Sequence, residues 1–182
     1  MKLTAHLVLL LFFCACSVSR GQTNSQIARV LWPNKELNVV CEVREQRPIS
    51  SGELPTRELS FVDSRGKRLT AIQTADRFLA MYPINDENGL FVTVWVGGSA
   101  YHISVFTWKD NKPKCVLESG SKAFPEIIFD VTKSGDTFFL LNDAPGGMDD
   151  SANWITRCYR WDGKKMILVK KIPASTRFGV LP

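Results

Sequence analysis

The side chains best able to do chemistry lie in one polar segment near the end of the chain, residues 142–153, and just after it. They are three carboxylates and one indole: Asp143, Asp149, Asp150 and Trp154. Paired carboxylates could act as general acid and base in hydrolysis, and tryptophan offers a large apolar surface with one N–H for ligand contact. A glycine-containing acidic stretch is equally typical of a solvated loop. We expect the binding surface here, if the protein has one.

The other reactive side chains are isolated from one another in the sequence. His102 lies in an expected strand and shares one face with Ser104 and Phe106, and a lone strand histidine is usually packed or solvated. The chain has neither the G-x-S-x-G spacing of a nucleophile elbow nor a glycine-rich phosphate loop opening a helix. The sequence therefore indicates no catalytic residue and no cofactor.

Three cysteines follow the N-terminal segment: Cys41, Cys115 and Cys158. An odd number allows at most one internal bridge, and none of them has the C-x-x-C spacing of a metal or redox site. We expect buried small apolar side chains, with one optional disulfide among the three, since an exported chain can hold disulfides.

The first residues are typical of an export signal. Lys2 precedes a short apolar run that ends near Cys16, and small polar residues follow it. We expect residues 1–21 to be a cleaved signal peptide, which makes the protein periplasmic or extracellular. The alternative is an outer-membrane lipoprotein lipidated at Cys16, because the residues before Cys16 are similar to a bacterial lipobox, with Phe13 in the place of an aliphatic residue. Only that alternative predicts a membrane partner.

The charge of the chain is mildly basic. The whole chain carries +5, and residues 1–21 hold two of the cations and no acid, so the mature protein would carry +3. Lysine and arginine are scattered, with no block of like charges, so we expect solvated turns and no nucleic-acid partner.

Two segments repeat the same hairpin pattern around Trp108 and Trp161. "SVFTWKDNKPKCVLE" aligns with "TRCYRWDGKKMILVK": an aromatic, a tryptophan, a polar turn and an apolar run. Asp162-Gly163 predicts a type I′ turn. The match extends upstream, where Gly89 aligns with Gly135 between two apolar runs. Each copy therefore predicts a four-stranded antiparallel meander.

The fold class that follows is all-β, with the meanders forming an incomplete propeller-like arc. The alternative is a two-sheet β-sandwich. The expected divisions after the signal are an N-terminal β segment that is a possible degenerate repeat, two repeat units and an irregular tail: 22–77, 78–121, 122–173 and 174–182.

The ending "CYRWDGKKMILVK" and the loop in "FDVTKSGDTFFLL" resemble the FG-GAP and VCBS-type repeats of exported bacterial proteins. That resemblance implies propeller-like blades and a calcium loop of the form D-x-D-x-D-G. Here Asp130 matches, but Thr132 and Ser134 replace acids, and the acids of residues 85–89 are differently spaced. We therefore expect degenerate loops and no metal site.

The function expected from these observations is an exported, non-enzymatic binding or interaction module of the bacterial envelope. Its partner would be an unknown protein or glycan. Two alternatives stay open: a small exported hydrolase that uses the loop carboxylates, and a lipid-anchored structural component of the envelope.

Overall fold

The computed structural model describes residues 23–33, 38–48, 52–84, 89–129, 137–143 and 154–173. The expected signal peptide, the lipidation site and the tail lie outside the described residues, as do two of the candidate site residues: residues 1–21, Cys16, residues 174–182, Asp149 and Asp150. All regular structure in the described part is strand, so the expected all-β class is confirmed.

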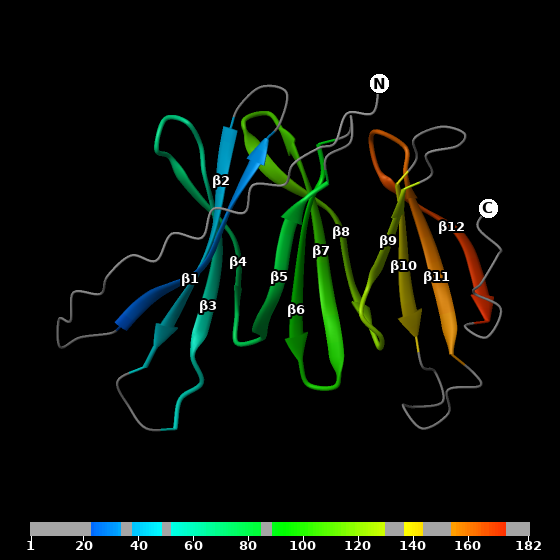
Figure 1. Ribbon diagram of the computed structural model, residues 1–182, viewed down its shortest axis with the longest axis horizontal. Coiled ribbons are helices and arrows are strands. Elements are labelled where there is room, and N and C mark those ends of the chain that lie inside the picture. The colour runs from blue at the N-terminus through cyan, green and yellow to red at the C-terminus, as the bar shows by residue number, and fades with distance from the viewer. Residues whose placement is uncertain are drawn as a thin grey trace, which may run out of the picture.

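In the described residues, twelve strands form three antiparallel sheets in chain order (Figure 1). The first sheet holds β1 (Thr23–Pro33), β2 (Asn38–Arg47), β3 (Thr56–Val62) and β4 (Arg68–Thr74). The second holds β5 (Arg77–Pro83), β6 (Phe91–Gly97), β7 (Ala100–Lys109) and β8 (Lys112–Ser121). The third holds β9 (Glu126–Phe129), β10 (Thr137–Asp143), β11 (Ile155–Trp161) and β12 (Met166–Pro173).

Each sheet is a meander of consecutive strands, and the three sheets stand in a row. This is the arrangement expected of an incomplete propeller-like arc, and the alternative of a two-sheet sandwich is wrong. Segment 22–77, where we expected a possible degenerate repeat, holds all four strands of the first sheet.

The two tryptophan hairpins are confirmed as antiparallel pairs, β7 with β8 and β11 with β12. Their turns lie at the expected residues, 109–112 and 162–165, but the second turn is not of the expected type. The first hairpin turns through Asp110 (φ 53°) and Asn111 (φ 58°), both in the left-handed region that a type I′ turn requires. In the second, Trp161 pairs with Met166, so the connection is four residues long and the type I′ prediction at Asp162-Gly163 is wrong.

Hydrogen bonds to one carboxylate explain the longer turn. Asp162 Oδ1 accepts the backbone N–H groups of Lys164 and Lys165, each at 2.8 Å. The backbone N–H groups of Lys165 and Lys164 also lower the pKa of Asp162. Gly163 takes φ 88° within this turn, a conformation that side chains with a Cβ disfavour.

We expect Gly163→Ala to lower the free energy of unfolding by about 1 kcal/mol, because alanine is strained at positive φ. A Cβ at Gly163 would meet no atom within 4 Å, so the effect would be purely conformational. Gly120→Ala is the matched control, since Gly120 has ordinary strand geometry and its nearest atom is the Tyr101 carbonyl oxygen at 3.9 Å. Urea unfolding measures both, and equal stability of the two variants would contradict the turn assignment.

An aromatic cluster joins the first and second sheets. Trp32 is fully buried, and its ring centroid lies 5.6 Å from Phe61, 5.3 Å from Phe91 and 5.9 Å from Trp108. Its indole N–H donates to the Gly89 carbonyl oxygen at 3.0 Å. Rings from both sheets thus share one core.

A second core joins the second and third sheets. Val92, Val94 and Ile103 meet Phe139 and Leu141 there. Trp161 belongs to this core, whereas Trp108 packs on the core shared with the first sheet. Each repeated tryptophan therefore packs against the sheet that precedes its own, which accounts for its recurrence.

Candidate functional site

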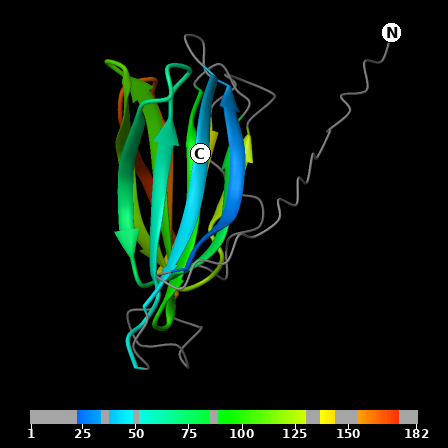
Figure 2. The ribbon, with the colours of Figure 1, turned by 90° about the vertical axis from the view of Figure 1, so that its left-hand side faces the viewer.

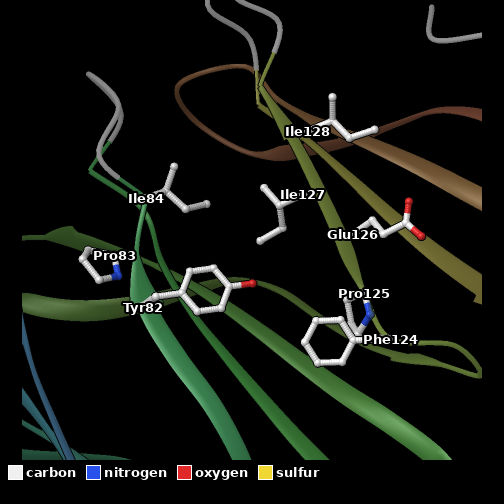
Figure 3. A pocket seen from close by; sticks show the side chains of 8 residues that line it. All are labelled: Tyr82, Pro83, Ile84, Phe124, Pro125, Glu126, Ile127 and Ile128. Carbon is white, nitrogen blue, oxygen red and sulfur yellow. The ribbon is translucent and has the colours of Figure 1, made fainter. Parts of the chain in front are cut away.

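A groove of about 710 Å³ opens between the ends of β5 and β9 (Figure 3). Each of these strands is the edge strand of its sheet. The described residues that line the groove are mostly apolar: Tyr82, Pro83, Ile84, Phe124, Pro125, Glu126, Ile127 and Ile128.

Two local contacts hold the apolar wall of the groove in position. The Ile84 N–H donates to the Leu90 carbonyl oxygen at 2.8 Å, and Ile84 is 3% exposed. Phe124 is 45% exposed and packs edge-on against Tyr101, with ring centroids 5.7 Å apart. The groove thus combines a buried apolar floor with one exposed aromatic ring.

Tyr82 is the main polar group that faces the groove. In Figure 3 its hydroxyl points toward the Pro125 side, whereas the Glu126 carboxylate points away from Tyr82. Burial raises the pKa of Tyr82, so the phenol stays protonated at neutral pH and can donate or accept a hydrogen bond. A ligand would meet an apolar wall with one well-placed hydroxyl.

Of the predicted binding residues, Asp143 has a structural contact. Its Oδ1 accepts Nη2 of Arg157 at 2.8 Å, and its Oδ2 lies 2.7 Å from Nε. Arg157 also donates to Ser119 Oγ at 3.0 Å and to the Gly120 carbonyl oxygen at 2.8 Å on β8. Asp143 therefore orients an arginine that ties the third sheet to the second.

Trp154 is partly buried, and its indole N–H is buried with no acceptor among the described residues. Neither Trp154 nor Asp143 is among the described residues that line the groove. The sequence reasoning thus missed the groove. The chain does carry a signal for it, the Phe124-Pro125 step directly before a short strand.

The structure pairs His102 with a residue that sequence reasoning did not select. His102 Nδ1 lies 2.6 Å from Asp76 Oδ2. The backbone of Asp76 is held by Arg57, which donates to its carbonyl oxygen at 3.1 Å, and a Cβ at Gly97 would overlap the Asp76 carboxylate. His102 is about half exposed, and the pair is not among the described residues of the groove.

The cysteines lie in three different sheets, on β2, β8 and β11, and all three are free. The optional disulfide among Cys41, Cys115 and Cys158 is therefore wrong. Cys41 and Cys158 are buried as expected, but Cys115 is exposed. Burial raises the pKa of Cys41, which makes it an inert core thiol.

The expectation of no metal site stays a prediction. The two candidate calcium loops fall largely on residues 85–88 and 130–136, outside the described residues. In the part of the chain that the structure does describe, no three His, Cys, Asp or Glu side chains gather to hold a metal ion. None of its segments forms a helix long and apolar enough to cross a membrane.

Comparison of the chain with protein-family models, with curated proteins and with solved structures gives no match. The resemblance to FG-GAP and VCBS-type repeats therefore stands on the sequence motifs alone.

Proposed function

We propose that the protein is an exported, non-enzymatic binding module of the bacterial envelope, and that its ligand lies in the groove between β5 and β9. The observation that carries this proposal is the apolar groove of about 710 Å³, with Phe124 45% exposed at its side. Concave, mostly apolar sites with a few polar groups are the usual form of ligand sites. The signal-like N-terminus supports the exported location.

The chemistry of the groove favours a protein segment over a glycan as partner. A glycan needs many hydrogen-bonding groups, and among the described lining residues the Tyr82 hydroxyl is the main polar group that points into the groove. Pro83 and Pro125 lack N–H groups, so strand addition along these two edges is blocked there. We infer an extended segment that inserts an apolar side chain and places a carbonyl oxygen near the phenol.

The described residues give less support to the alternative of a small hydrolase. One of its candidate carboxylates, Asp143, is held by Arg157 through two oxygen contacts of 2.7 and 2.8 Å. This ion pair gives Asp143 a structural role, because Arg157 in turn ties the third sheet to the second. The remaining candidates, Asp149 and Asp150, lie outside the described residues.

A capture experiment tests the proposal. We expect Phe124→Asp to weaken binding of a partner from envelope extract by at least about tenfold, because it puts a charge beside the apolar wall. Leu31→Asp is the matched control, since Leu31 is 52% exposed on the first sheet. Both variants should melt near the wild-type temperature. If the wild type and Phe124→Asp captured the same proteins equally well, the proposal that the groove is the binding site would be wrong.

A further inference from the structure

The outer face of the first sheet gathers three arginines around one carboxylate. Glu42 lies opposite Arg29 on β1 and opposite Ser60 on β3. Its neighbours Cys41 and Val43 point into the core shared with the second sheet, so Glu42 points the other way. Figure 2 looks at the molecule from the side of this sheet. We call the set Arg29, Arg44, Arg68 and Glu42 the arginine face.

The contacts within the arginine face are unequal. Arg68 Nη2 donates to Glu42 Oε2 at 2.8 Å, and its Nη1 donates to Ser60 Oγ at 2.8 Å. Arg44 Nη2 donates to the same Glu42 oxygen at 3.1 Å. Arg29 Nε lies 3.6 Å from Glu42 Oε1, beyond a good hydrogen bond. Arg68 is thus the main partner of Glu42.

The remaining cationic charge is in surplus. Three guanidinium groups and one carboxylate give the arginine face a net charge of +2. Glu58 lies opposite Arg44 on β3, and including its carboxylate still leaves the net charge positive. The Glu42 side chain is 9% exposed, whereas those of Arg29 and Arg44 are 59% and 41% exposed. One arginine is enough to pair a buried carboxylate. Arg29 and Arg44 each carry further N–H donors besides those that face Glu42, and both side chains reach solvent.

We propose that the arginine face is a binding site for a phosphate group. Guanidinium forks match the geometry of phosphate oxygens and bind them through paired, charge-assisted hydrogen bonds. The sheet holds Arg29 and Arg44 on adjacent strands, and Glu42 lies between them at its base. This site is separate from the groove and does not depend on the function proposed for it.

Titration with pyrophosphate at low ionic strength tests the site. We expect millimolar or tighter binding that weakens as salt is added, and about tenfold weaker binding for Arg29→Gln. Arg77→Gln is the matched control, because it removes one positive charge from an exposed residue of β5. No binding by the wild type, or equal weakening by both variants, would overturn the proposal, since the second result means diffuse charge only.

Glu42→Gln separates a binding role from a structural one. Removing the competing carboxylate should tighten pyrophosphate binding several-fold and enlarge the rise in melting temperature that pyrophosphate causes. Lower stability with no gain in binding would mean that the arginines only pair Glu42. Vesicles of phosphatidylglycerol distinguish the source: binding that Arg29→Gln abolishes assigns a lipid headgroup, and binding of pyrophosphate alone assigns a soluble phosphate ester.

Discussion

Replacing Trp32 by alanine is expected to lower the free energy of unfolding by about 4 kcal/mol, the range for a large aromatic removed from a packed core. Trp32 is fully buried. It contacts Phe61 of its own sheet together with Phe91 and Trp108 of the second sheet. The cavity would therefore open at the junction of two sheets. Urea denaturation followed by circular dichroism measures the loss.

Two control variants separate the contributions. Leu31→Ala changes a neighbouring residue that is 52% exposed, and we expect an effect below about 1 kcal/mol. Trp32→Phe keeps a ring in the cluster but removes the hydrogen bond to the Gly89 carbonyl oxygen, so it should lie between the other two. If Trp32→Ala were no more destabilising than Leu31→Ala, the two sheets would not share this core.

Replacing Arg57 by alanine is expected to cost about 3 kcal/mol, because it leaves a buried carboxylate without its main partner. Arg57 Nη2 lies 2.7 Å from Glu45 Oε2, and the two side chains are 12% and 9% exposed. Nη1 of Arg57 also donates to the carbonyl oxygens of Ala75 and Asp76 at 2.9 and 3.1 Å. One side chain thus joins the first sheet to the start of the second.

The arginine nearer the surface is the control. Arg47 Nε donates to Glu45 Oε1 at 2.8 Å, but its side chain is 71% exposed. Solvent screens such a contact, so we expect Arg47→Ala to cost less than about 1 kcal/mol. Equal losses for Arg47→Ala and Arg57→Ala would contradict the assignment of Arg57 as the buried partner.

The same pair predicts how stability depends on pH. Hydrogen bonds from Arg47 and Arg57 lower the pKa of Glu45 below its ordinary value of 4.5, against the opposing effect of burial. A carboxylate with a lowered pKa stabilises the fold above its unfolded pKa, and this contribution is lost as the pH falls through the folded pKa. Wild-type stability should therefore fall below about pH 4.5, and Arg57→Ala should flatten that dependence. An unchanged slope in the variant would argue against the pairing.

Both tryptophan hairpins could be predicted from the amino-acid sequence alone. The repeated pattern around Trp108 and Trp161 predicted both hairpins, because apolar alternation and polar turns are properties of contiguous residues. The turn at 162–165 was expected, but the type I′ conformation at Asp162-Gly163 was wrong, because the Asp162 carboxylate organises the whole turn. A dipeptide motif cannot show which hydrogen bond will close the turn.

Which faces of the sheets meet, and which distant residues come together, became apparent from the packing of the three sheets. Alternation assigns each strand two faces, but it does not say which of them packs against the next sheet. The groove joins Ile84 to Ile127, and the His102 ring meets Asp76, across separations that no local pattern records. The sequence predicted Asp143 as a binding carboxylate, whereas in the structure it forms an ion pair with Arg157. A carboxylate or histidine acquires its role from its spatial neighbours, and sheet packing supplies those neighbours.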